Sequence, residues 1–157
     1  MNASHSSDAP GVIAIPPLIY LGFLVLGVVL EWLWPSSFLP RTLQYVIGLA
    51  LISVSAAIAA LAVAQFRKAN TNLDVRKPAT ALVVSGPFRY SRNPMYLALT
   101  LMYLGVGIVA DSAWILGLIV PTLCLMHFGV IRREERYMER KFGGKYRRYK
   151  SSVRRWL

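Results

Sequence analysis

The sequence contains little negative charge and almost no cysteine. Only 7 of its 157 residues are Asp or Glu, and charged residues of both signs make up 16% of the chain, against about 25% in a typical globular protein. The single Cys124 excludes an internal disulfide framework. Hydrophobic residues reach 55%, yet 18 Lys and Arg leave a net charge of +11. Such a chain has to separate apolar from basic residues, which excludes a disordered or fibrous protein and argues against a plain nucleic-acid-binding domain.

Four long apolar runs hold most of the hydrophobic residues. They cover residues 12–34, 42–64, 94–110 and 113–131, and none carries the polar stripe of a surface helix. A helix needs about 20 apolar residues, with about 17 as the lower limit, to cross a bilayer. The chain is too short to bury four such helices under other protein. We therefore expect one integral-membrane domain over residues 1–157: an all-α, polytopic membrane helix bundle of four transmembrane helices plus a cytoplasmic amphipathic C-terminal helix.

The basic residues predict how the bundle is oriented. Six of the 18 lie in the loop 65–93 and eleven in the tail 132–157, whereas the connection 35–41 holds one. With four spans, that loop, the tail and the N-terminus share one side, and the positive-inside rule makes this side cytoplasmic. We expect both termini in the cytoplasm, and the short chain is typical of a prokaryotic plasma-membrane protein.

The second apolar run predicts a helix-packing face. Ala56, Ala60 and Ala64 follow one another at intervals of four residues, and small residues at this spacing let two helix backbones approach closely. Gly105 and Gly107 in the third run have a similar character. We expect the three alanines to pack helix against helix rather than to bind a ligand, whereas the two closely spaced glycines could also leave room for a flat ligand.

The end of the tail has the pattern of an interfacial helix. After Gly143 and Gly144, aromatic and apolar residues recur at helical spacing with Lys and Arg between them: Tyr146, Tyr149, Val153, Trp156 and Leu157. A cationic amphipathic helix of this kind lies on an anionic lipid leaflet. Alternating aromatic and basic residues also suit RNA, but a tail tethered to a membrane favours lipid. We therefore expect membrane lipids as partners and no nucleic acid.

The cytoplasmic segments are where a ligand site is expected. The loop 65–93 is long for a compact chain, and such loops are commonly functional. It ends at Asn93 and Pro94, which suit the N-cap and the first turn of the third helix. A helix N-terminus favours an anionic group. Because the third and fourth runs form a hairpin with a short turn, residues 93–96 and 132–135 must meet at one mouth of the bundle.

Two separated motifs resemble one group of membrane enzymes. Residues 80–96, TALVVSGPFRYSRNPMY, resemble the signature of the isoprenylcysteine carboxyl methyltransferase and phospholipid methyltransferase families. Glu134-Glu135, Phe142-Gly143 and the Tyr-x-x-Tyr that begins at Tyr146 resemble their second signature. The resemblance extends from about residue 65 to 155, with an apolar hairpin between the two motifs.

The resemblance implies an S-adenosylmethionine-dependent methyltransferase, isoprenylcysteine carboxyl methyltransferase-like, whose cofactor binds between the helices on the cytoplasmic side. Carried onto this chain, the cofactor-binding residues of the family are Thr80, Ala81, Leu82, Val83, Phe88, Asn93, Pro94, Met95, Tyr96 and Glu134. Further candidates are Arg92, Glu135, His127, Tyr146 and Tyr149. We expect no metal, and no residue is assigned as a catalytic base.

Two departures from the family pattern concern the methyl acceptor. Asn93 stands where the isoprenylcysteine branch has His, and Val130, four residues before Glu134, stands where that branch has an Arg implicated in substrate binding. A prenylated-protein substrate is therefore not supported, and a lipophilic acceptor with a carboxyl, amine or thiol group stays open. Two other functions also remain: a non-catalytic membrane protein whose basic tail binds lipid or a partner, and a membrane reductase of related fold that uses a nicotinamide cofactor.

Overall fold

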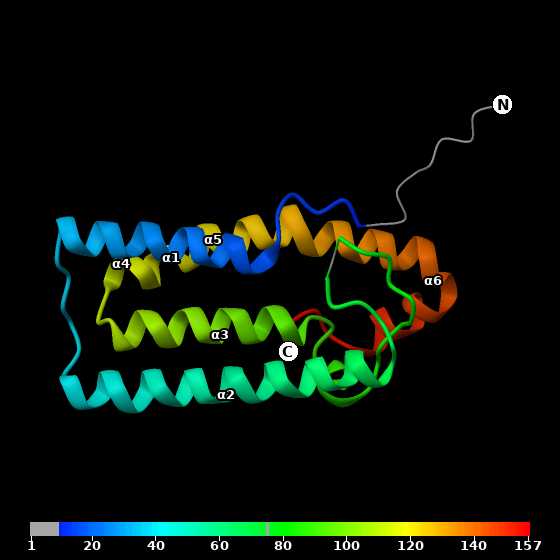
Figure 1. Cartoon of the computed structure of the whole chain (residues 1–157), viewed down its shortest axis with the longest axis horizontal. Coiled ribbons are helices and arrows are strands. Elements are labelled where there is room, and N and C mark those ends of the chain that lie inside the picture. The colour runs from blue at the N-terminus through cyan, green and yellow to red at the C-terminus, as the bar shows by residue number, and fades with distance from the viewer. Residues whose placement is uncertain (1–9, 75) are drawn as a thin grey trace.

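The computed structural model describes residues 10–74 and 76–157, and the regular structure in this part of the chain is entirely helical (Figure 1). The elements are α1 (Pro16–Leu33), α2 (Arg41–Lys68), the 3-10 turn η1 (Gly86–Arg89), α3 (Pro94–Val109), α4 (Ala113–Gly117), α5 (Ile119–Met126), the π turn η2 (His127–Ile131) and α6 (Arg132–Ser152). The all-α class expected from the sequence is confirmed. The segment 1–9, expected in the cytoplasm, lies outside the described residues.

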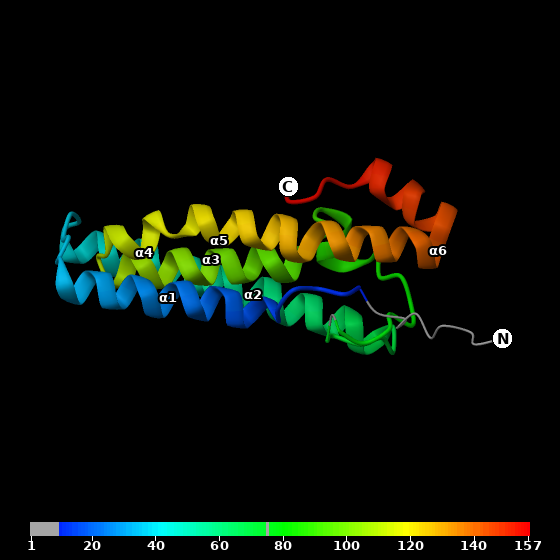
Figure 2. The ribbon, with the colours of Figure 1, turned by 90° about the horizontal axis from the view of Figure 1, so that it is seen from above.

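The helices lie side by side as four columns: α1, α2, α3 and a long column in which α4, α5, η2 and α6 follow end to end (Figures 1 and 2). Within residues 10–74 and 76–157, three columns are long and apolar enough to cross a membrane: Pro16–Leu33, Arg41–Lys68 and Ala113–Ser152. The fourth, α3, is also apolar but has 16 residues, about 24 Å at the helical rise of about 1.5 Å per residue. The charged residues of the long column begin at Arg132, so its apolar part ends at Ile131.

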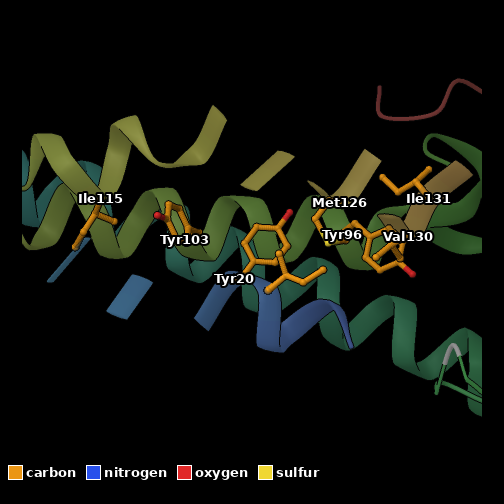
Figure 3. Packing of buried hydrophobic residues seen from close by; sticks show 8 residues of the cluster. Tyr20, Tyr96, Tyr103, Ile115, Met126, Val130 and Ile131 are labelled. Atoms are coloured by element: carbon orange, nitrogen blue, oxygen red, sulfur yellow. The ribbon is translucent and has the colours of Figure 1, made fainter. Parts of the chain in front are cut away.

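The main core lies where α1, α3 and the long column meet. Its buried residues include Tyr20, Tyr96, Tyr103 and Val130 (Figure 3). The rings of Tyr20 and Tyr103 pack edge to face, with centroids 6.0 Å apart, and the hydroxyl groups of Tyr20 and Thr100 lie 2.7 Å from each other. A buried hydroxyl group is costly without such a partner. This packing holds the ring of Tyr96 in a defined place at the first turn of α3.

Helix α2 packs along α3 through small residues spaced seven apart. Gly48, Ser55 and Ala62 are the buried residues of α2, and Ser55 Oγ donates a 2.7 Å hydrogen bond to Ala98 O on α3. A Cβ atom on Gly48 would lie 2.9 Å from the carbonyl oxygen of Gly105. The two helix backbones are therefore in direct contact at this crossing.

The packing face expected at Ala56, Ala60 and Ala64 is wrong in register. Ala56 and Ala60 are exposed, and Ala64 is half-buried. A step of seven residues drifts about 20° around a helix, so it stays on one side over many turns, whereas a step of four drifts about twice as far in the other direction. The long contact with α3 therefore selects the seven-residue spacing. Gly105, expected to pack against a helix, does so.

Two acidic residues close the end of the bundle that is remote from α6. Asp111, with a φ of 51°, accepts a 3.0 Å hydrogen bond from the backbone N–H of Leu39. Glu31 accepts hydrogen bonds of 2.6 Å from the hydroxyl groups of Ser36 and Ser112. These bonds tie the α1–α2 connection to the α3–α4 turn. The acids at this end are thus occupied by structural hydrogen bonds.

Replacing Gly48 with Ala should disturb the contact between α2 and α3. The added methyl group would clash with Val109 Cγ2 and lie 2.9 Å from Gly105 O, and overpacking of this kind costs about 1–3 kcal/mol. We expect the unfolding temperature in detergent to fall by about 2–12 °C. Gly22→Ala on α1 is the matched control, because nothing lies within 4 Å of its added Cβ. Equal unfolding temperatures for the two variants would contradict the close contact.

Candidate active site at the charged end of the bundle

The loop between α2 and α3 folds over the charged end of the bundle. Thr71 Oγ1 accepts hydrogen bonds from the backbone N–H groups of Thr80 (3.0 Å) and Ala81 (3.3 Å), which joins two separate parts of the loop. Further along, the ring of Phe88 packs edge to face on Phe66 near the end of α2, with centroids 5.3 Å apart. These contacts anchor the loop to α2 and bring it beside the N-terminus of α3.

Tyr96 and Glu134 join the start of α3 to the start of α6. Tyr96 Oη donates a 2.6 Å hydrogen bond to Glu134 Oε2, which confirms that the two ends of the hairpin meet. Among the described residues, no Lys or Arg pairs with Glu134. Burial raises the pKa of the Glu134 carboxyl above its usual value, although the Tyr96 hydrogen bond acts in the opposite direction. Glu134 is thus an acid without a counter-charge in this part of the chain.

Glu135, the next residue, is paired twice. Its carboxylate oxygens accept hydrogen bonds from Arg155 Nε (2.9 Å) and Nη2 (2.8 Å), and Arg92 Nη1 lies 3.1 Å from Oε1. Burial alone would raise the pKa of Glu135, but the Arg155 hydrogen bonds and the two positive charges outweigh it and lower the pKa. Glu135 is therefore paired with two arginines, whereas the adjacent Glu134 has no cationic partner among the described residues.

Two adjoining cavities lie at this end of the bundle. The smaller has a volume of about 90 Å³ and lies between the loop and α6. The larger has a volume of about 340 Å³ and lies between the loop and the starts of α1 and α3. Polar and charged side chains contribute much of the smaller lining, whereas apolar side chains dominate the larger. The residues that line both cavities are Phe66, Leu73, Asp74, Phe88, Arg92, Asn93 and Glu134.

The cavities collect most of the residues that the sequence singles out for cofactor binding. The smaller cavity is lined by Ala81, Leu82, Val83, Phe88, Asn93 and Glu134. The larger cavity is lined by Phe88, Asn93, Pro94, Met95, Tyr96 and Glu134. Of the further candidates, Arg92 lines both cavities, and Glu135, Tyr146 and Tyr149 line the smaller one. Residues from four separate segments therefore share one region, and their contact with a cofactor stays a prediction.

Two of the expected residues lie elsewhere. Thr80 lines a separate surface groove, and its Oγ1 donates a 2.8 Å hydrogen bond to Asn70 O. His127 lies in the π turn η2, where its ring packs edge to face on Phe128 with centroids 4.8 Å apart. It lines neither of the two adjoining cavities. The structure therefore does not bring these two side chains to the shared region.

The C-terminal tail folds back over the site. Gly143, with a φ of 53°, bends α6, and the second half of the helix returns toward the bundle (Figure 2). Tyr146 and Tyr149 are buried, and Tyr149 Oη donates a 2.7 Å hydrogen bond to Phe88 O. The aromatic face expected to lie on lipid is therefore covered in part by the protein itself.

Asn93 occupies the N-cap position of α3, but its side chain does not cap the helix. Its Nδ2 donates a 2.9 Å hydrogen bond to Arg155 O, and its backbone N–H donates one of 3.1 Å to Ser91 Oγ. The expected side-chain cap is therefore wrong, because the returning tail offers the amide group a carbonyl acceptor. Pro94, which has no N–H to satisfy, still begins the helix as expected.

Several lining residues were not expected from the sequence. Leu73 and Asp74 come from the loop, where no periodic pattern marks them. Tyr137 and Met138 line the smaller cavity and follow Glu134 by three and four residues. The helical period places them on the same face as Glu134, so this spacing could have identified them.

Comparison with known proteins shows the family. A model of the phospholipid methyltransferase family matches residues 43–145, about two thirds of the chain. The match begins in α2 and ends in α6, and it includes the loop and the hairpin that supply most of the residues lining the two cavities. The chain therefore belongs to the phospholipid methyltransferase family, a family of membrane methyltransferases, and its apolar helices agree with an integral membrane protein.

Individual relatives match shorter parts of the chain. An uncharacterized protein of Haemophilus influenzae is 49% identical over 65 residues, which are 40% of this chain and 100% of that protein. The cobalt-zinc-cadmium resistance protein CzcN of Cupriavidus metallidurans is 34% identical over 61 residues, which are 39% of this chain and 28% of CzcN. This chain thus covers little more than a quarter of CzcN. No solved structure matches the chain.

The hydrogen bond between Tyr96 and Glu134 should couple the two residues energetically. We expect Tyr96→Phe and Glu134→Gln to be non-additive in unfolding free energy by about 1–3 kcal/mol, because the bond is partly buried and joins two helices. A double-mutant cycle by unfolding in detergent measures this coupling. The control cycle combines Tyr96→Phe with Glu139→Gln, since Glu139 pairs with Lys150 at 3.2 Å. Additive effects in both cycles would show that the bond does not hold the helices together.

Proposed function

We propose that this protein uses S-adenosylmethionine as methyl donor and methylates a lipophilic acceptor that carries a carboxyl, amine or thiol group. The observation behind the proposal is Glu134, an acid without a cationic partner in the described residues that lines both cavities. It lies inside the segment that matches a methyltransferase family. S-adenosylmethionine has a sulfonium and an ammonium group, and a carboxylate stabilises either of these cations.

The residues near Glu134 fit such a donor. Phe88 lines both cavities and Tyr96 lines the larger one, and aromatic faces attract cations. The apolar residues 81–83 line the smaller cavity and suit a flat heterocyclic base. When bound, S-adenosylmethionine supplies a methyl group attached to a good leaving group. The protein therefore has to bind the donor, orient it and shield it from water, and we propose these side chains for that role.

The larger cavity suits the acceptor. Ile15, Pro16, Met95 and Leu99 give it an apolar lining from the starts of α1 and α3. Methyl transfer is an in-line displacement, so the contribution of the protein is to align the two reactants in a site with little water. A carboxylate acceptor is already ionised, whereas an amine or thiol has to lose a proton. The apolar lining supports an acceptor with a lipophilic body.

We infer further that all four columns cross the membrane, with both termini and the two cavities at the cytoplasmic face. The loop and the tail hold 17 of the 18 Lys and Arg residues, and this bias favours the cytoplasm. The second half of α6 also presents Arg147 and Arg148 as exposed cations. Exposed cations next to a bilayer favour contact with anionic lipid headgroups, so we expect membrane lipids as partners of this surface.

Reporter fusions test this orientation. A fluorescent protein fused after Leu157 should fluoresce in bacterial cells, because it matures in the cytoplasm. Alkaline phosphatase inserted at Ser37, in the connection between α1 and α2, should be active, because it needs the other side of the membrane. The reverse pattern would contradict the proposed orientation, and cytoplasmic behaviour at both positions would contradict four spans.

Calorimetry on the detergent-purified protein tests the donor. We expect S-adenosylmethionine and S-adenosylhomocysteine to bind with submillimolar dissociation constants. Glu134→Gln should weaken binding about tenfold or more, since it removes the charge that faces the ligand cations. Glu139→Gln should leave binding unchanged, because Glu139 is occupied in an ion pair with Lys150.

The other outcomes of the same titration separate the alternatives. A folded protein that binds neither compound would argue for a non-catalytic membrane protein, and binding of NADPH in their place would argue for a reductase. Once donor binding is established, incubation of the protein with a radiolabelled methyl donor, total membrane lipids and small thiols identifies the acceptor class by the product that carries the label.

A further inference from the structure

Arg92 is a buried cation with unused hydrogen-bonding capacity. Its side chain is 9% exposed, and it lines both cavities. Its Nε has no hydrogen-bond partner among residues 10–74 and 76–157. A buried N–H group without an acceptor is costly, and a guanidinium group binds carboxylate and phosphate oxygens well. This position therefore suits an anionic group of a ligand.

Arg155 sets the charge balance around Arg92. Glu135 is 8% exposed and lies between the two guanidinium groups, at 2.8 Å from Arg155 Nη2 and 3.1 Å from Arg92 Nη1. The cluster of these three side chains therefore carries a net positive charge, with Arg92 and Glu135 buried and Arg155 31% exposed. If Arg92 were the sole partner of Glu135, the pair would be neutral and would attract an anion only weakly. The Arg155 side chain therefore keeps Arg92 effective as a cation.

The backbone of the same tail holds the segment that carries Arg92. Arg154 O accepts a 3.0 Å hydrogen bond from the backbone N–H of Arg92. Arg155 O accepts hydrogen bonds from Ser91 Oγ (3.2 Å) and Asn93 Nδ2 (2.9 Å). Figure 2 shows the end of the chain returning past the bend of α6 toward the bundle. Backbone atoms fix the place of Arg92, whereas the Arg155 side chain sets its charge, so a side-chain substitution separates the two effects.

We propose that Arg155 acts through Glu135: by pairing with that carboxylate it lets Arg92 bind the carboxylate of the donor's amino-acid group, while Glu134 binds the ammonium of that group. This inference rests on the proposed function, because it concerns the same site. An amino-acid group carries both charges close together. Arg92 and Glu134 line the same two cavities, and each has an unmet interaction of the matching sign.

Two ligands that differ by one carboxylate test the inference. Calorimetry compares S-adenosylhomocysteine with its decarboxylated form, which keeps the adenosine and the amine. We expect the parent protein to prefer S-adenosylhomocysteine, and Arg155→Gln to weaken that ligand about tenfold, the usual effect of one charge-assisted contact, while the decarboxylated ligand is unaffected. Arg154→Gln is the matched control, because it removes an exposed charge one residue away and keeps the backbone carbonyl.

The remaining outcomes contradict the inference in distinct ways. If Arg155→Gln weakens both ligands equally, or neither, Arg155 does not act through the carboxylate. If the parent protein binds both ligands equally well, no residue of the site binds the carboxylate, which contradicts this inference and leaves the proposed function standing. If the protein binds neither ligand, the proposed function is contradicted as well. Should Arg155→Gln fail to fold, Arg155→Lys keeps the charge, so it should keep the preference for S-adenosylhomocysteine. Loss of that preference in a folded Lys variant would overturn the charge argument.

Discussion

Tyr96 donates a hydrogen bond to Glu134 across the mouth of the hairpin, and the rest of the site depends on this contact. Charged side chains are costly in an apolar layer, so the cations of this chain collect beyond the apolar columns, together with four of its seven acids. Apolar packing alone brings the two ends of the hairpin near each other but does not orient a carboxylate. The hydrogen bond does, and it keeps Glu134 on the lining of both cavities.

Glu134 and Glu135 show how one motif divides into two roles. Successive residues of a helix point about 100° apart, so one carboxylate reaches Tyr96 on α3 and the other reaches Arg92 and Arg155. The second acid joins three segments of the chain in a buried ion cluster. The first is left without a counter-charge among the described residues. The pair therefore combines an acid that is neutralised by two arginines with an acid that lines both cavities and has no cationic partner in this part of the chain.

Membership of the phospholipid methyltransferase family indicates the class of chemistry, which is methyl transfer. The acceptor is proposed from the lining of the larger cavity. The matched segment begins at residue 43. Ile15, Pro16 and Pro17, which line the larger cavity, precede that segment. The larger cavity thus combines residues from the family's hairpin with residues from the start of α1, which lie outside the matched segment. The metal-resistance description of CzcN belongs to a protein of which this chain matches 28%, so it assigns no function to the cavities.

The sequence by itself determined the all-α class, the separation of charge from apolar helices and the meeting of the two hairpin ends. The helical class and the separation of charge follow from hydropathy and charge over continuous runs. The meeting of the hairpin ends follows from the short turn between the third and fourth runs, which makes these runs antiparallel neighbours. Only the tertiary structure decided the contact register of α2, the partner of Asn93 and the pairing of Glu135 with Arg155. Those depend on where the bend at Gly143 sends the tail. Side chains twenty residues apart meet only when the path between them is known, because local propensity does not encode that path.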